Sequence, residues 1–117
     1  MATELVASFE IDGLHHWPDA PDHFSEFRQP HRHLFKFVCF VPTTDPVHGF
    51  ERSIELWELR EGLILRVHGI FGQPGMQLGV IDFGALSCEG IASKFKEDVF
   101  LSKVFVGEEY WLGALVS

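Results

Sequence analysis

The sequence predicts an α+β protein in which one sheet is covered by two helices on one face. Three observations support this class. Alternating apolar runs near both ends of the chain indicate strands, two central segments repeat apolar residues at helical spacing, and the resulting order is β-β-α-α-β-β. The 117 residues are the usual size of one domain, and no repeat or linker divides them, so a single domain over residues 1–117 is expected.

The first two predicted strands precede the helices. Leu5–Ile11 alternates apolar and polar residues, as a half-buried strand does. The loop that follows contains prolines at positions 18 and 21, which favour irregular structure. The second strand is expected from about Arg32 to Val41, and the proline-bounded residues 42–46 end it in a turn.

The first helix is predicted within residues 54–67. Residues 54–56 can close a strand, but from Trp57 onward three apolar residues lie four apart on one helical face: Leu59, Leu63 and Val67. Gly62 costs such a helix about 1 kcal/mol relative to alanine. Residues 69–84 contain five glycines and a proline, which predicts a loop.

The second helix is expected to begin after Ser87. Serine is a favoured N-cap residue, and Glu89 would lie in the first turn, where the helix dipole favours an acid. Ile91, Phe95 and Val99 then form an apolar stripe. After this helix, residues 104–106 alternate as a third strand and residues 110–116 as a fourth.

The composition limits the possible partners. The formal net charge is −8, from 17 acidic and 9 basic residues, which argues against binding nucleic acid or an anionic membrane surface. There is no recognisable secretory signal and no apolar run long enough to cross a bilayer. We therefore expect a soluble cytoplasmic protein in which Cys39 and Cys88 are free thiols.

Histidines are concentrated in one part of the sequence, with five of the seven between residues 15 and 33. His31 and His33 lie two apart at the start of a predicted strand, so both imidazoles should point to the same face. A metal would bind them in the neutral form and remove their mutual repulsion. With one residue of the pair His15-His16 they would supply three imidazoles, the ligand set of a catalytic zinc. His16 and His23 are equally well explained as surface residues of a polar loop.

Several carboxylates are candidates for chemistry: Glu55, Glu58, Glu89, Glu108 and Glu109. Glu89 is sufficiently explained by its place at a helix N-terminus. Glu108 follows a predicted strand, where its side chain can project into a pocket or lie in a solvated turn. Cys88 would also lie at a helix N-terminus, where the dipole can lower a thiol pKa. Without a visible base partner, it is better explained as a small buried apolar residue.

Six short segments, taken in order, carry a family resemblance. They are a strand that runs into His15-His16-Trp17-Pro18 (residues 9–18), an H-x-H followed by an aromatic residue (31–35), a D-x-x-x-G turn (45–49), an apolar-acid-aromatic segment (54–59), a helix opening with Ser87 and Glu89 (86–92), and a V-x-V-x-E strand (104–108). Together they resemble the 6-pyruvoyl-tetrahydropterin synthase family, which includes the bacterial 6-carboxytetrahydropterin synthases of queuosine biosynthesis. The resemblance covers nearly the whole chain.

The resemblance implies the T-fold, a four-stranded antiparallel sheet with two helices. Its subunits associate into a barrel, and the proteins are usually homo-oligomers, often hexamers, with sites between subunits. It also implies a Zn²⁺ ion held by His15, His31 and His33, with His16 as the competing first ligand. Glu108 corresponds to the glutamate that anchors the pterin ring.

The chain departs from the family pattern at its proton-transfer residues. Phe27 stands where the family usually has a cysteine, and Glu26 is the available replacement. His68 matches the histidine of an Asp-His pair, but Val67 precedes it in place of the aspartate. The resemblance thus assigns proton transfer to Glu26 or His68, without the aspartate that would orient the imidazole.

Two main functions follow as expectations. The first is a zinc-dependent lyase that acts on dihydroneopterin triphosphate or a related pterin. The alternative is a non-catalytic T-fold module that binds a pterin- or purine-like ligand, which the missing cysteine and aspartate favour. A third possibility is a structural oligomer in which zinc only fixes the loop from His15 to His33.

Overall fold

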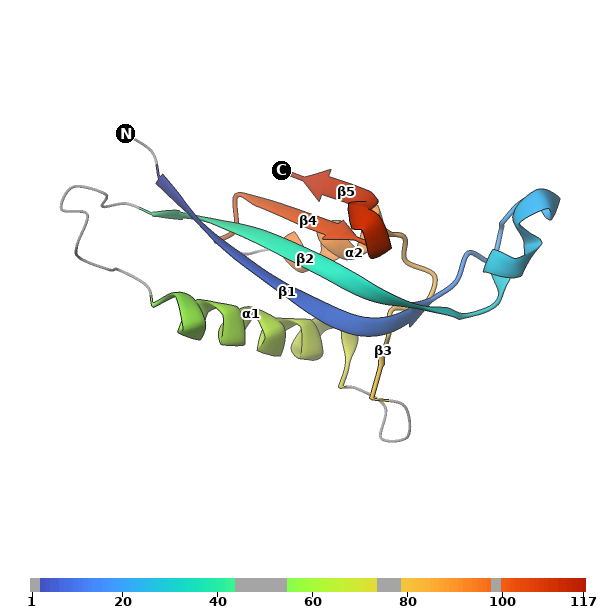
Figure 1. Cartoon of the computed structure of the whole chain (residues 1–117), viewed down its shortest axis with the longest axis horizontal. Coiled ribbons are helices and arrows are strands. Elements are labelled where there is room, and N and C mark those ends of the chain that lie inside the picture. The colour runs from blue at the N-terminus through green and yellow to red at the C-terminus, as the bar shows by residue number, and fades with distance from the viewer. Residues whose placement is uncertain (1–2, 44–54, 74–78, 98–99) are drawn as a thin grey trace.

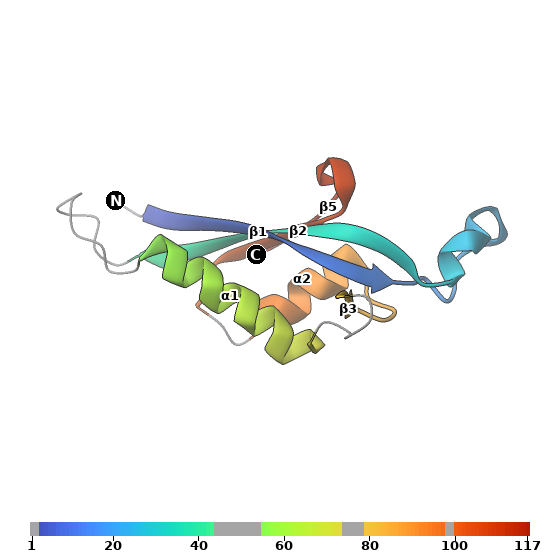
Figure 2. The same cartoon turned by 60° about the horizontal axis from the view of Figure 1, so that its bottom comes forward.

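A five-stranded sheet carries two α-helices on one face in the computed structural model of the chain, which describes residues 3–43, 55–73, 79–97 and 100–117 (Figures 1 and 2). The strands are β1 (Thr3–His15), β2 (His31–Thr43), β3 (Ile81–Asp82), β4 (Lys103–Gly107) and β5 (Gly113–Val116). The helices are α1 (Leu56–Phe71) and α2 (Cys88–Lys96), with short 3-10 helices η1 (Asp22–Arg28) and η2 (Glu109–Trp111). The strand order in space is β3-β1-β2-β4-β5.

The predicted α+β class is confirmed, and the number of strands is corrected. β1, β2, β4 and β5 pair antiparallel as expected. β3 is a fifth strand inside the predicted loop 69–84, and it pairs parallel to β1 with Ile81 opposite Gly13. A two-residue strand is too short to show alternation in the sequence, although Ile81 is fully buried.

The hairpin of β1 and β2 forms the longest part of the sheet. The two strands pair in one continuous register from Thr3 opposite Thr43 to His15 opposite His31. Both strands extend beyond the predicted ranges 5–11 and 32–41. Their ends carry polar residues that pair with the opposite strand, which alternation within one strand does not reveal.

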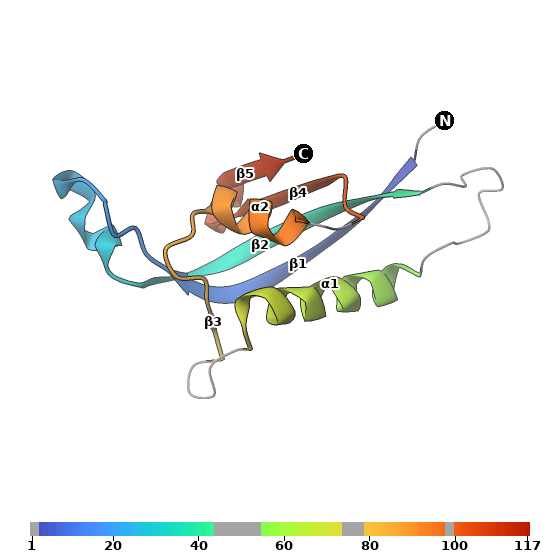
Figure 3. The same ribbon diagram turned by 180° about the vertical axis from the view of Figure 1, so that it is seen from behind.

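Alternation in the strands directs one face of the sheet toward the helices. The buried side chains of β2 are Phe35, Phe37, Cys39 and Val41. From behind, the sheet lies with α2 across β4 and β5, while α1 runs along β1 (Figure 3). The predicted helix faces are confirmed, since α1 buries Leu59, Leu63 and Val67 and α2 buries Ile91 and Phe95. Val99 lies outside the described residues.

The starts of both helices have well-defined caps. Ser87 accepts a hydrogen bond from the Gly90 N–H at 3.1 Å, which confirms it as the N-cap of α2. Glu55 caps α1 by accepting from the Glu58 N–H at 2.9 Å. The strand interpretation of residues 54–56 is therefore wrong for Glu55 and Leu56, because the cap places Leu56 in the first helical turn. Ile54 and most of the predicted turn at 42–46 lie outside the described residues.

Boundaries outside the first two strands also differ from the structure, and α1 continues to Phe71, inside the predicted loop 69–84. Part of the proline-rich loop folds into η1, and the last strand begins at Gly113 rather than at Tyr110. Tyr110 and Trp111 have positive φ angles of 66° and 60°, which no strand accommodates. Within the described ranges, neither α-helix is long and apolar enough to cross a membrane.

Candidate metal centre

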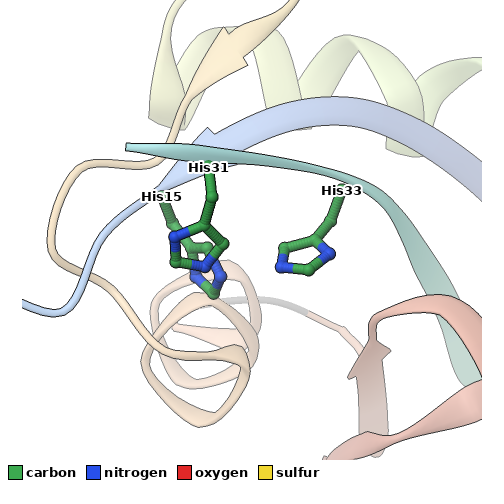
Figure 4. A group of neighbouring side chains, drawn as sticks. All are labelled: His15, His31 and His33. Atoms are coloured by element: carbon green, nitrogen blue, oxygen red, sulfur yellow. The ribbon is translucent and has the colours of Figure 1, made fainter. Parts of the chain in front are cut away.

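The register of the hairpin brings three histidines together at one end of the sheet. His15 ends β1 and lies directly opposite His31, the first residue of β2. His33 follows two residues later and therefore lies on the same face. Each side chain offers one ring nitrogen, and the three nitrogens all lie within 4.8 Å of one another (Figure 4). The predicted grouping of His15, His31 and His33 is thus present in the folded chain.

Each of the three imidazoles places its Nδ1 against an oxygen acceptor. The contacts are His15 Nδ1 to the Leu86 carbonyl at 2.9 Å, His31 Nδ1 to the Gln29 carbonyl at 3.1 Å and His33 Nδ1 to Glu109 Oε2 at 2.7 Å. Since these oxygens only accept, each Nδ1 carries the proton, and a neutral ring then presents the lone pair of its Nε2. Metal-binding histidines in proteins are oriented in this manner.

His15 is the most buried of the three, with 8% of its surface exposed. Burial lowers the pKa of His15, and the neighbouring His31 and His33 lower it further, against the raising effects of the Leu86 carbonyl and Glu108. Its Nε2 is buried and makes no hydrogen bond with any residue that the structure describes. A buried nitrogen without a partner is costly unless a ligand occupies it, so the site fits a metal ion.

Two consecutive acidic residues lie beside the histidines. Glu108 Oε1 is 3.2 Å from His15 Nε2 and 3.6 Å from His33 Nε2. Glu109 accepts from His33 and also from the Leu34 N–H at 3.0 Å. Although burial alone would raise it, the pKa of Glu109 is lowered by hydrogen bonds from its own backbone, from Leu34 and from His33. Glu109 is therefore an ionised group that orients His33.

A tight turn positions both carboxylates. The Glu108 N–H donates to the Leu112 carbonyl at 2.7 Å, and the Trp111 N–H donates to the Glu108 carbonyl at 3.2 Å. Tyr110 and Trp111, with their positive φ angles, reverse the chain between these bonds. Such conformations cost free energy and are found where the surrounding structure requires them.

The histidines open onto a cavity of about 460 Å³. Trp17, Phe27 and Leu86 contribute apolar side chains to its wall. The ring centroid of Phe27 lies 5.3 Å from that of His31. The cavity thus combines polar ligands on one side with aromatic surfaces that suit a planar organic molecule.

The remaining predicted site residues lie at different distances from this centre. His16 lines the cavity but does not belong to the group of clustered nitrogens, so the structure favours His15 as the ligand. Glu26 is exposed on η1, and His68 is half-buried in the last turn of α1. Neither lines the cavity within the described chain. Their assignment to proton transfer stays a prediction.

The other candidates take structural positions. Glu55 and Glu58 lie at the start of α1, and Glu89 lies in the first turn of α2. Burial raises the pKa of the Cys88 thiol to about 11, with Glu108 and Glu109 adding to the effect. Burial also raises the pKa of Cys39 to about 12. Both cysteines are free, and neither has the lowered pKa of a nucleophilic thiol.

Sequence reasoning missed the groups that orient the imidazoles. Glu109 was a candidate only as part of an acidic pair, and its contact with His33 links residues 76 positions apart. The carbonyls of Leu86 and Gln29 have no sequence signature, because every residue carries one. Identifying these carbonyls requires knowledge of which loops lie next to the histidines at the strand ends.

The fold and the site define an α+β protein with three clustered histidines suited to holding a metal ion. The chain matches no protein-family model, and no curated protein matches its sequence. The resemblance to the 6-pyruvoyl-tetrahydropterin synthase family is therefore carried by the short motifs alone.

Proposed function

We propose that this protein binds Zn²⁺ through His15, His31 and His33 and acts as a zinc-dependent lyase on a pterin, in the manner of 6-pyruvoyl-tetrahydropterin synthases. The observation that carries the zinc proposal is the set of three imidazoles whose Nδ1 atoms are all engaged by acceptors. The motif resemblance supplies the substrate class. A homo-oligomer in the cytoplasm, with dihydroneopterin triphosphate or a related pterin as substrate, belongs to the same proposal.

This proposal assigns separate roles to the zinc ligands and to the groups that orient them. Zinc held by His15, His31 and His33 would supply Lewis acidity to polarise a substrate oxygen and acidify the neighbouring C–H bond. The Leu86 and Gln29 carbonyls and the Glu109 carboxylate hold the imidazoles in their metal-binding tautomer.

The cavity walls would bind the heterocycle. Trp17 and Phe27 offer faces for stacking a planar ring. Glu108 can accept hydrogen bonds from the amino and ring N–H groups of a pterin. Proton transfer by Glu26 or His68 requires that a neighbouring subunit or a movement of the chain bring them to the cavity, since neither lines it here.

The test has two parts. Purified protein is expected to contain one zinc per chain, and His31→Ala is expected to lose it. Zinc-loaded protein incubated with dihydroneopterin triphosphate should then release triphosphate faster than His31→Ala does. Protein that binds no stoichiometric zinc would overturn the whole proposal, whereas zinc binding with equal triphosphate release would overturn only the lyase activity on this substrate.

A specific observation favours a second function, ligand binding without turnover. Phe27 occupies the cavity wall where the family usually has a reactive cysteine, and the replacement acids and bases lie outside the cavity. Under this alternative, a pterin or guanine-type compound binds to the zinc protein in a calorimetric titration and is recovered unchanged. Recovery of a shortened or rearranged pterin would exclude it.

A further inference from the structure

The Glu108 side chain lies beside two imidazoles but receives no hydrogen bond from the residues that the structure describes. Its Oε1 atom lies 3.2 Å from His15 Nε2 and 3.6 Å from His33 Nε2. In a tetrahedral zinc site, bonds of about 2.0–2.2 Å place two neighbouring ligand atoms about 3.4 Å apart. Glu108 Oε1 thus lies at ligand-to-ligand distance from two of the three imidazoles.

Hydrogen bonding does not account for these distances. His15 Nε2 makes no hydrogen bond within the described chain, although Glu108 is beside it. The Nδ1 atoms of His15 and His33 already carry the ring protons, so their Nε2 lone pairs face a negatively charged oxygen. Two electron-rich atoms at this separation repel one another unless a cation lies between them.

The neighbouring acid provides a contrast within the same turn. Glu109 is held by the imidazole of His33 and by the Leu34 N–H. The carboxylate of Glu108 has no comparable donor among the described residues, and 31% of its side chain is exposed. One acid is therefore held by two donors, while the other lies between the histidines and the cavity that it lines without such donors.

We propose that Glu108 is the fourth ligand of the metal, and that it closes the site until an incoming ligand displaces it. This inference rests on the three-histidine metal site of the proposed function and concerns how access to that site is controlled. The displaced carboxylate stays at the cavity wall, where it can accept N–H donors of the molecule that replaced it. Ligands that bring their own metal-binding oxygen or nitrogen atom are thereby favoured over those that only fill the cavity.

Cobalt(II) provides a probe that does not depend on catalysis. We would load the wild-type protein, Glu108→Ala, Glu108→Gln and the control Glu89→Ala with Co²⁺, then record visible absorption and titrate each with azide. Glu89 is an exposed acid at the start of α2, outside the cavity, so it matches the loss of charge without touching the site. Circular dichroism would check that each variant is folded.

The expected result is a change of the cobalt spectrum in both Glu108 variants and not in Glu89→Ala. Azide should bind about tenfold more tightly to Glu108→Ala than to wild type, the factor expected if Glu108 leaves one tenth of the sites open. Identical spectra and identical azide affinities in wild type and both Glu108 variants would overturn the inference and leave the three-histidine site intact. Failure of the wild-type protein to bind Co²⁺ at all would instead overturn the proposed function on which the inference rests.

Discussion

The three histidines and the two residues predicted to transfer protons, Glu26 and His68, occupy regions of different construction. The histidines lie on paired strand ends whose register runs unbroken along the whole hairpin. Glu26 lies on a 3-10 helix that buries no residue and has a non-helical kink at Phe24. His68 lies in the last turn of α1 and does not line the cavity.

This difference shows that one folded chain preorganises the three histidines of the predicted site but not Glu26 and His68. Backbone pairing fixes the separation of His15, His31 and His33, and acceptors orient each ring. Sites built on strands with such support are held more accurately than sites on loops. The three-histidine group is therefore assembled within one chain, whereas Glu26 and His68 are not brought to it.

The largest expected effect is on metal affinity. Replacement of His33 by alanine should weaken zinc binding by more than about 100-fold, the upper end of what loss of an orienting group alone causes. Glu26→Gln and His68→Gln should leave affinity within about twofold, since neither residue lies at the cavity. Competition with a chromophoric chelator measures all three. A similar loss in either control would show that metal binding also depends on Glu26 or His68.

The next effect concerns the orientation of His33. In Glu109→Ala the imidazole loses its Nδ1 partner at 2.7 Å, so zinc affinity should fall about 10–100-fold. Glu89→Ala removes one acidic charge elsewhere and should not change it. The same chelator competition applies. Equal affinities in Glu109→Ala and wild type would show that strand register alone suffices to place His33.

A third effect tests how tightly the sheet is packed under the histidines. Gly13 lies opposite His33, and a Cβ atom there would come within 2.5 Å of the buried Phe83 ring. Gly13→Ala should therefore lower the free energy of unfolding by about 1–3 kcal/mol. At Gly62 in α1 an added Cβ would meet no described atom within 4 Å apart from the helix's own backbone, so Gly62→Ala should stabilise the protein by up to about 1 kcal/mol. Urea unfolding of both variants measures the contrast, and a Gly13→Ala variant as stable as wild type or a Gly62→Ala variant less stable than wild type would refute it.

The smallest effect lies at the far end of β1. Hydrogen bonds from Ser102 and Lys103 lower the pKa of Glu4. Its contribution to stability is therefore present above the unfolded pKa of about 4.3 and is lost as the pH falls through the lower folded value. Glu4→Gln should be slightly less stable than wild type at pH 7, and this difference in urea midpoints should shrink as the pH is lowered below 4. Metal affinity should not change.

Sequence patterns predicted those parts of the fold that depend on one segment at a time. Alternation placed His31 and His33 on one face, and helical spacing identified Ile91 and Phe95 as buried residues of α2. β3 was not predicted, because its two residues form a strand only by pairing with Gly13 and Leu14, which are far away in the sequence. The start of β5 was misplaced because residues 110 and 111 adopt positive φ angles, which are not expected for tyrosine and tryptophan.

The same distinction applies to the candidate site. The three clustered histidines were identified because strand periodicity and one hairpin suffice to gather them. Their hydrogen-bond acceptors come from three separate segments, which are Gln29 before β2, Leu86 before α2 and Glu109 after β4. The last two reach the histidines only because α2 packs on the sheet and β4 pairs with β2. Glu109 was visible as a residue type, but its role required knowledge of which strand lies next to β4.

At Tyr110 and Trp111, the stability of the turn and the order of the candidate site favour different residues. A non-glycine residue in the left-handed region costs roughly 1–2 kcal/mol, and here two such residues are consecutive. Glycine at either position would relieve that strain but would also loosen the backbone that carries Glu108 and Glu109. Selection for a more stable protein and selection for a well-ordered site therefore act in opposite directions on these two residues.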